Sequence, residues 1–278
     1  MRRLIFEEPV SQTAIWSQRL ARYAIALALL AVIAGHARGF LARFFAAATL
    51  RPDNVPAPNL SLFVFAAALA CAALALLVAL AAAIVIWRKG LRGVGRIVRA
   101  VLLVVVLLAY PAYLGLAALQ LPWLADISTD IADPPNYSLS RVALKGRGGW
   151  TPEPLDAGQR QAQAVAYPEI QSLLVGMDEK QTFKQAWQLA EQMHWTILDS
   201  SPPIVRRGQS PLIGHIDALA HTSALGLPVA ITIRITPLEG ETRVDVRAAS
   251  RYLPHDFGAG AALIGKLTEA LQEKDDEE

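Results

Sequence analysis

Two long runs without a charged residue constrain what this chain can fold into more than any other feature. The segment 60–87 carries no charge over 28 residues, and the segment 100–125 is also free of charge. Each run exceeds the ~20 apolar residues that a helix needs to cross ~30 Å of hydrocarbon. A helix is expected for both, because backbone groups in lipid must find hydrogen-bond partners within their own segment. We therefore predict transmembrane helices over about 60–87 and 100–124, with a kink at Pro111 in the second.

A third, shorter apolar segment precedes these two runs. Its charge-free core, residues 23–35, is short for a span. The flanking Arg19, Arg22 and Arg38 can, however, extend their charged ends towards the two membrane interfaces. We therefore predict a first transmembrane helix over about 20–38, and three spans in all. The alternative for this segment is a cleaved signal peptide, which would leave two spans.

The distribution of basic residues predicts the orientation of the spans. Basic residues precede the first span, and others fill the loop between the last two: Arg2, Arg3, Arg19 and Arg22, then Arg88, Lys89, Arg92, Arg96 and Arg99. The connection 51–59 is rich in proline and poor in cations. Because cytoplasmic loops carry an excess of Lys and Arg, we expect the amino terminus inside the cell. The carboxy-terminal half is then outside, which in a bacterial inner-membrane protein means the periplasm.

The two halves of the chain carry opposite charge. Residues 1–125 hold 12 Lys and Arg against 3 Asp and Glu, a net +9, whereas residues 126–278 hold 14 against 21, a net −7. An acidic soluble half argues against nucleic acid as a partner, because its phosphates require clustered cations. Cys71 is the only cysteine, so no internal disulfide can form, and its thiol in an apolar run is expected to be inert. No nucleotide-binding motif is present, and no cofactor is expected.

Residues 126–278 are predicted to form one soluble α+β domain, separate from a membrane domain over residues 1–125. Irregular structure is expected up to about Pro168, and a helix is predicted after Asp178, with Gln181 in the third position of a capping box. Further elements are predicted as strands over 195–199, 212–222, 229–236 and 242–250, then a helix over 259–272 and a solvated acidic tail over 273–278. This order is typical of an antiparallel sheet flanked by helices.

The stretch 244–260, VDVRAASRYLPHDFGAG, holds the strongest candidate site. Alternate side chains of a strand share a face, so Arg243, Asp245 and Arg247 should point away from the helices. One interpretation is a ladder of ion pairs on an open sheet face. The other is an anion site, because surplus arginines can hold a carboxylate or phosphate through paired hydrogen bonds. Its predicted ligand-binding residues are Arg247, Arg251, Ser250 and Gly258, the last through amide donors at a helix start.

A weaker alternative is a metal site built from histidines. His215, Asp217 and His221 have even spacing and share one face of their strand. At about 3.4 Å per residue, His215 and His221 stand roughly 20 Å apart. One of them would therefore have to combine with His255 or Asp256 to hold a zinc ion. A serine-hydrolase triad is disfavoured because the sequence has no G-x-S-x-G motif, and no catalytic residue is predicted.

The segment DVRAASR…HDFG resembles the signature of a bacterial family, the domain of unknown function 1499 (DUF1499), in its membrane-bound form. The matching residues are Asp245, Arg247, Ser250, Arg251, Asp256 and Gly258, and the resemblance covers most of residues 126–271. Ala248 and Gly260 depart from the pattern, which favours serine and asparagine at these positions. Because the family has no agreed activity, the resemblance implies a fold module and no reaction.

Three functional hypotheses follow from these observations. The leading one is non-enzymatic: an inner-membrane protein whose periplasmic domain binds a protein partner or a small anionic ligand. The second is a metal-assisted hydrolase that acts in the periplasm. The third is a structural protein that organises other membrane components. In all three the lipid bilayer is the immediate partner.

Overall fold

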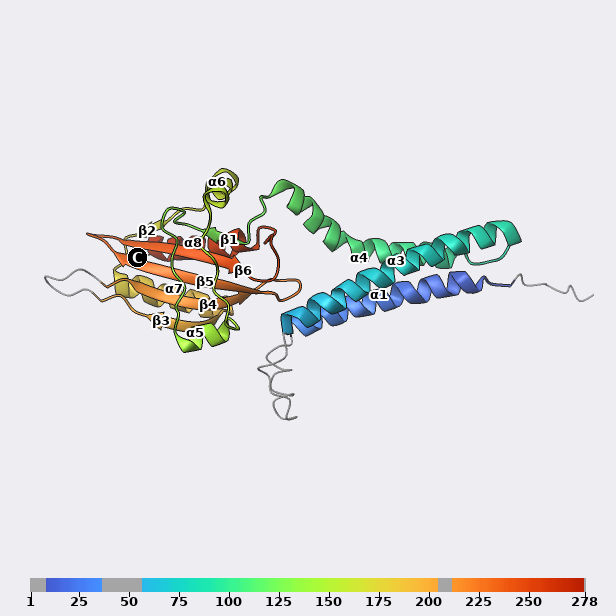
Figure 1. Cartoon of the computed structure of the whole chain (residues 1–278), viewed down its shortest axis with the longest axis horizontal. Coiled ribbons are helices and arrows are strands. Elements are labelled where there is room, and N and C mark those ends of the chain that lie inside the picture. Colours follow the sequence, from blue (N-terminus) through green and yellow to red (C-terminus); the bar gives the residue numbers. More distant parts are fainter. Residues whose placement is uncertain (1–8, 37–56, 205–211, 278) are drawn as a thin grey trace, which may run out of the picture. The chain divides into compact units, whose positions relative to one another are not determined.

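The computed structural model describes residues 9–36, 57–204 and 212–277. The chain divides into two compact units, and the main boundary falls between Leu116 and Ala117. The first unit is helical and the second is built on a β-sheet (Figure 1). The predicted class, α+β preceded by three long apolar helices, is thereby confirmed. Arg2, Arg3, Arg38 and residues 51–56 of the proline-rich connection lie outside the described residues.

Three helices of the first unit are long and apolar enough to cross a membrane. They are α1 (Gln12–His36), α3 (Ala57–Lys89) and α4 (Val94–Gln120). α1 and α4 begin ahead of their expected starts at residues 20 and 100. The reason is that a hydropathy pattern marks the apolar stretch of a helix and not the polar turns that extend it. Pro111 lies within α4, which continues on both sides.

Small side chains allow α1 and α3 to pack closely. The buried positions are Ala14, Ser17, Ala21, Ala24 and Ala31 on α1, and Ala68, Ala72, Ala75, Ala79 and Ala82 on α3. They lie three, four or seven residues apart, so that each set forms one stripe along its helix. In lipid, helices associate through close van der Waals packing, which small residues permit. Cys71 lies beside this interface, where its thiol donates to the carbonyl of Leu20 at 3.3 Å.

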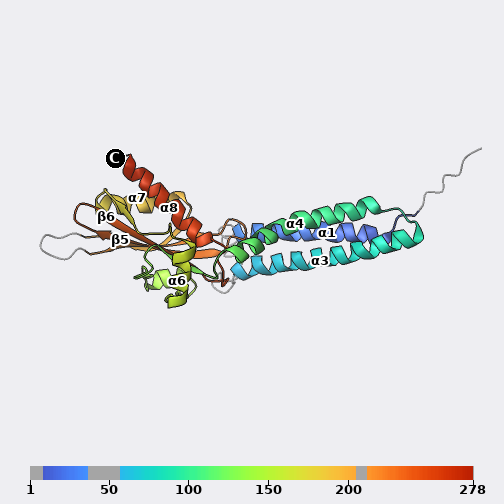
Figure 2. The same cartoon turned by 90° about the horizontal axis from the view of Figure 1, so that it is seen from above.

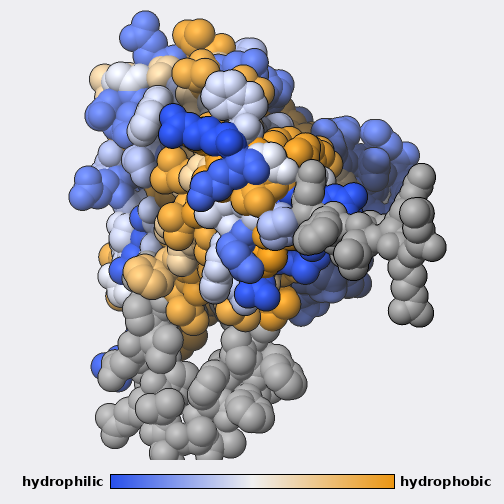
Figure 3. Space-filling view, turned by 90° about the vertical axis from the view of Figure 1, so that its right-hand side faces the viewer, coloured by the Kyte–Doolittle hydropathy of each residue, from blue (hydrophilic) through white to orange (hydrophobic). Residues whose placement is uncertain are grey.

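One end of the helical unit is basic. Ser11, immediately before α1, donates its amide to the carbonyl of Arg92 in the turn between α3 and α4, at 2.9 Å. The start of α1 and this turn therefore lie at the same end of the bundle. The same end carries Arg88 and Lys89 at the last turn of α3. Figure 3 looks onto this end and shows hydrophilic side chains gathered in front of the hydrophobic helices.

The second unit contains a six-stranded antiparallel sheet in the order β1-β6-β5-β4-β3, and β2 pairs with β6 beyond the end of β1. The strands are β1 (Asp126–Ser128), β2 (Leu173–Val175), β3 (Thr196–Ser201), β4 (Gly214–His221), β5 (Pro228–Pro237) and β6 (Thr242–Ser250). The predicted meander of the last three strands is confirmed. The strands β1 and β2 were not predicted, because three residues are too few to show a period.

Helices α7 (Glu179–Gln192) and α8 (Ala259–Asp276) cover one face of the sheet (Figure 2). Alternate strand residues fill the core beneath them: Ile231, Ile233, Ile235, Val244, Val246 and Ala248. Asp178 caps α7 as predicted, because its side chain accepts the amide of Gln181 at 2.8 Å. The acidic tail predicted from residue 273 is exposed at Glu273, Asp276 and Glu277, but it is helical and not all of it is solvated. α8 continues to Asp276, and Asp275 accepts the amides of Gly176 and Met177 beside β2.

The chain between β1 and β2 covers the opposite face, and in Figure 1 it crosses in front of the sheet. It contains α5 (Arg141–Gly146) and α6 (Ala157–Ala166). The prediction of irregular structure up to Pro168 was therefore wrong. α6 begins with a capping box formed by Asp156 and Gln159, but its few large apolar residues hide the helical period. We refer to residues 129–155 as the strap.

Candidate functional site

The sheet face beneath the strap carries charged side chains in two adjacent rows. The strand register places Asp217, Thr232 and Arg247 side by side on β4, β5 and β6. The next row holds Arg234 opposite Asp245. Both rows follow from the two-residue period of a strand, because the alternate residues fill the core under α7 and α8. Asp217 and Asp245 are fully buried and Arg247 is 5% exposed. The expectation of an open sheet face was therefore wrong, since the strap covers it.

Arg247 is bound by Asp126, the first residue of β1. Its Nε lies 3.0 Å from Oδ1 of Asp126, and its Nη2 lies 2.6 Å from Oδ2. The same guanidinium also donates to the carbonyls of Pro135 and Glu153 on the strap. Burial alone would lower the pKa of Arg247, but the hydrogen bonds with Asp126 outweigh it and raise that pKa. The buried charge is thus paired, as stability requires, and it holds three chain segments together.

Arg234 on β5 binds three carboxylates at once. Its Nη1 lies 2.8 Å from Asp133, and its Nη2 lies 2.9 Å from both Asp130 and Asp245. Arg243 joins this cluster, with its Nε 3.1 Å from Asp245. The two arginines therefore fasten the first residues of the strap to β5 and β6.

Tyr137 fastens the middle of the strap. Its hydroxyl donates to the carbonyl of Ala230 at 3.2 Å. The guanidinium carbons of Arg147 and Arg247 lie 5.4 and 5.2 Å from the centre of its ring, within cation–π range. Arg147 in turn pairs with the buried Asp217 at 2.9 Å. Burial raises the pKa of Tyr137 well above its ordinary value, so that the phenol stays neutral and acts as a donor.

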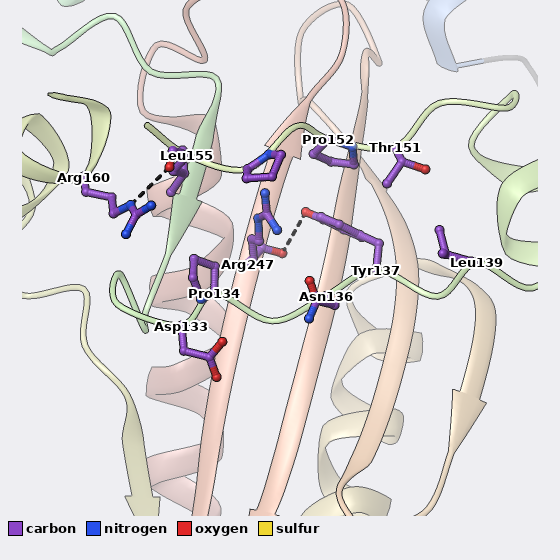
Figure 4. A pocket seen from close by; sticks show the side chains of 11 residues that line it. Asp133, Pro134, Asn136, Tyr137, Leu139, Thr151, Pro152, Leu155, Arg160 and Arg247 are labelled. Carbon is purple, nitrogen blue, oxygen red and sulfur yellow. Dashed lines mark hydrogen bonds between the residues drawn. The ribbon is translucent and has the colours of Figure 1, made fainter. Parts of the chain in front are cut away.

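A cleft of about 350 Å³ opens within the strap (Figure 4). It lies between the strap segments 133–139 and 151–155, and Arg247 on β6 lies between these two segments. Tyr137 and three prolines of the strap also line it. A proline has no backbone N–H, so the prolines offer a bound ligand apolar surface and no amide donor.

Arg160 of α6 lines one end of this cleft and is exposed to solvent. Its Nε donates to the carbonyl of Leu155 at 3.1 Å. Within the described parts of the chain, no carboxylate pairs with Arg160, and its two Nη groups have no hydrogen-bond partner. Arg160 therefore brings an uncompensated positive charge to the cleft, whereas the charge of Arg247 is matched by Asp126.

Of the four residues predicted to bind an anion, Arg247 lines the cleft and the other three do not. Arg251 is exposed and donates to the carbonyls of Arg147 and Gly148 at 3.2 and 3.3 Å. Ser250 is the last residue of β6. The structure therefore does not bring these side chains to one concavity.

The start of α8 is occupied by a carboxylate of the chain itself. The amides of Gly258 and Gly260 donate to the two carboxylate oxygens of Asp256, at 2.9 and 2.8 Å. Burial raises the pKa of Asp256, and these two amide bonds oppose that rise. The donors that were expected to serve an external anion are therefore already used within the fold.

The histidines of the zinc alternative also stay apart. His215 lies 3.8 Å from Asp199 on the neighbouring strand. His255 stacks on Phe257 and accepts the amide of that residue on its Nδ1 at 2.8 Å. His221 is the last residue of β4. Among the residues that the structure describes, no group of three or more His, Cys, Asp and Glu side chains could hold a metal ion.

Sequence reasoning missed four residues of this face, because it expected only irregular structure up to Pro168: Asp126, Tyr137, Arg147 and Arg160. One signal was available. β6 carries two arginines and one aspartate on the face opposite the core. A buried arginine on this face therefore needs a carboxylate partner from another part of the chain. The closely spaced Asp126, Asp130 and Asp133, which follow the last apolar run, supply such carboxylates.

Comparison with known proteins identifies the second unit. A family described as "Protein of unknown function (DUF1499)" matches residues 126–271, just over half of the chain. The matched region begins at Asp126, the partner of Arg247, and includes the strap, the cleft and the whole sheet. No curated protein and no solved structure matches the sequence. The protein therefore belongs to the DUF1499 family and carries three candidate membrane helices ahead of the family domain.

Proposed function

We propose that this protein is a bacterial inner-membrane protein that exposes its family domain to the periplasm and binds a small anionic ligand in the strap cleft. The three apolar helices support insertion into a membrane. The start of α1 and the turn between α3 and α4 share one basic end, which supports placing both in the cytoplasm. With three spans, the chain after Gln120 is then on the opposite side.

The unpaired guanidinium of Arg160 is the observation that carries the ligand proposal. A carboxylate or phosphate can accept two parallel hydrogen bonds from the Nη groups of an arginine. Asp133 is the carboxylate that lines the cleft, and it is already paired with Arg234. An acidic ligand group near Arg160 therefore meets an uncompensated positive charge and no uncompensated negative one.

The size and lining of the cleft indicate the rest of the ligand. A volume of about 350 Å³ is near the lower end of the ~300–1,000 Å³ range of small-molecule sites. Leu139, Leu155 and the prolines supply apolar surface, while Asn136 and Thr151 supply neutral polar groups. The fitting ligand is a small molecule with one acidic group and a short, weakly polar body.

Thermal unfolding of the full chain in detergent tests the ligand site. Inorganic phosphate and succinate serve as probes, against sodium chloride at matched ionic strength. We expect both probes to raise the unfolding temperature, because a ligand at 100 times its Kd adds about 2.7 kcal/mol to stability. The variant Arg160→Gln should lose this rise. The control Arg141→Gln removes an exposed arginine of α5 and should keep it. Equal stabilisation of both variants, or no anion-specific stabilisation, would contradict the proposal.

Reporter fusions test the orientation separately. Alkaline phosphatase fused after Glu278 should be active, because the enzyme requires the periplasm. The same reporter inserted at Gly90, in the turn between α3 and α4, should be inactive. The opposite pattern would place the family domain in the cytoplasm.

A further inference from the structure

A shallow groove lies where the family domain leaves the last membrane helix. One wall is formed by Gln120, Leu121 and Pro122, and the other by one side of α6, including Gln161 and Val165. None of the residues that line this groove is charged. An uncharged surface is unusual here, because residues 126–278 carry a net charge of −7 (14 Lys and Arg against 21 Asp and Glu).

Large apolar side chains are exposed at this end of the domain. Val165 is 78% exposed on α6, and Trp123 is 68% exposed just after the groove wall. Leu119, just before the wall, is also exposed. Exposed apolar surface of this kind marks contact with another apolar phase when its members lie together. The groove itself is lined mainly by apolar residues, so it offers apolar surface to an occupant.

The length of α4 places the groove at the membrane interface. Arg99 is the last charged residue of this helix, and 21 residues run from Ala100 to Gln120 (120 − 99). At 1.5 Å per residue these 21 residues span about 31 Å, close to the ~30 Å thickness of the hydrocarbon core. With Arg99 at one interface, Gln120 lies at the other. The groove wall continues directly from Gln120, so it lies beside the lipid headgroups.

We propose that α6 is an interfacial helix, and that bilayer phospholipid fills the groove between it and residues 120–122. Trp123 fits this role, because tryptophan is enriched where a span meets the interface. The two sides of α6 then have separate partners. Arg160 faces the strap cleft, whereas Gln161 and Val165 face the groove. This inference does not depend on a ligand in the cleft.

Site-specific fluorescence quenching tests this contact in the full chain. Cys71→Ala removes the native thiol, and Val165→Cys then introduces a single site for an environment-sensitive fluorophore. Val142→Cys is the matched control, since Val142 is 68% exposed on α5. α5 contacts β3 at one edge of the sheet, whereas α6 is bonded to β1 at the other through Gln163 and Ser128.

Each labelled protein is placed in nanodiscs of phosphatidylcholine and phosphatidylglycerol that contain a nitroxide-labelled phosphatidylcholine. The label at position 165 should lose a larger share of its fluorescence to the lipid nitroxide than the label at position 142. Aqueous iodide should give the reverse order. If iodide quenches both labels equally and the nitroxide quenches neither, the groove faces water and the proposal fails. If neither quencher reaches position 165, protein covers the groove, and the proposal also fails.

Discussion

Arg247 of β6 donates hydrogen bonds to both carboxylate oxygens of Asp126 on β1, and its Nη2 lies 2.6 Å from Oδ2. Asp126 is the sixth residue after the end of α4, so this ion pair fastens the first strand of the family domain to β6. Both side chains are almost fully buried. The pair is therefore structural in the first place, and the anion site proposed in the cleft depends on Arg160 instead.

Removing the guanidinium of Arg247 should destabilise the domain strongly. Arg247→Met leaves the Asp126 carboxylate buried and unpaired, a change that typically costs about 3–5 kcal/mol. The double variant Asp126→Asn/Arg247→Met should recover part of this loss, because no buried charge then remains. Thermal unfolding of the full chain in detergent measures both effects. Arg251→Gln serves as the control and should cost less than about 1 kcal/mol, since Arg251 is exposed. A small effect of Arg247→Met would contradict the buried ion pair.

The close approach of α8 to Asp256 predicts opposite effects for two glycines of the same helix. A Cβ atom at Gly260 would lie 2.8 Å from Oδ2 of Asp256, and Gly260 is buried. Gly260→Ala should therefore displace this carboxylate and cost about 1–3 kcal/mol, as overpacking usually does. Gly265 has open space around it, and Gly265→Ala should stabilise the helix by roughly 0.5–1 kcal/mol. Equal unfolding temperatures for the two variants would show that the start of α8 is not packed in this way.

Asp130 predicts a loss of stability in acid. Burial alone would raise the pKa of Asp130, but the amide of Asp133 and the guanidinium groups of Arg243 and Arg234 lower it below its ordinary value of 3.8. A carboxyl whose pKa is lower in the folded state stabilises the fold above its unfolded pKa. That contribution is lost as the pH falls through the folded pKa. Asp130→Asn should therefore unfold at a lower temperature than the parent protein at pH 7.

The difference in unfolding temperature between the parent protein and Asp130→Asn should shrink as the pH falls below 3.8, the ordinary pKa of the Asp130 carboxyl. Asp133→Asn is the control at pH 7. The side chain of Asp133 is 78% exposed in its pair with Arg234, so its loss should cost less than about 1 kcal/mol. A pH-independent difference between Asp130→Asn and the parent protein would mean that the charge of Asp130 is not what stabilises the strap.

Two adjacent alanines of α3 should respond differently to enlargement. Ala72 is buried in the stripe that packs the three membrane helices, whereas its neighbour Ala73 is exposed on the helix surface. Ala72→Leu should push the helices apart and cost about 1–3 kcal/mol, because a packed interface has no room for three more carbon atoms. Ala73→Leu should be neutral, since its side chain faces lipid. Equal unfolding temperatures for the two variants in detergent would mean that small side chains do not determine the packing of α3.

Much of the fold could be predicted because the relevant signals are local. Charge-free runs identified α3 and α4, and two-residue alternation identified the central strands β4, β5 and β6. The alternation also assigned Arg243, Asp245 and Arg247 to the face that points away from the helices. The short strands β1 and β2 and the helices α5 and α6 escaped, because few large apolar residues mark them. β1 and β2 form by pairing with the edge of β6, and α5 and α6 form in the chain that covers the charged face of the sheet.

The candidate site was less predictable, because its parts are far apart in the sequence. Arg247 was predicted to bind an external anion, whereas its partner within the fold, Asp126, precedes it by 121 residues. Gly258 was expected to bind an external anion, yet Asp256, two residues away, already accepts its amide. Arg160 had no motif at all. It became a candidate only when the fold placed it at the end of a cleft.

The sequence by itself determined that three apolar helices precede an α+β domain. Backbone in lipid must be hydrogen-bonded within its own segment, and a strand shows a two-residue period. Both signals can be read from a short stretch of sequence. The sequence also determined which face of β6 carries charge. Only the tertiary structure decided which of the two arginines that line the cleft keeps an uncompensated charge. The strap supplies carboxylates to Arg234 and Arg243, and Asp126 of β1 supplies one to Arg247, but none of the described carboxylates reaches Arg160. Pairing of charges depends on distances in space, and these are set by how the strap crosses the sheet.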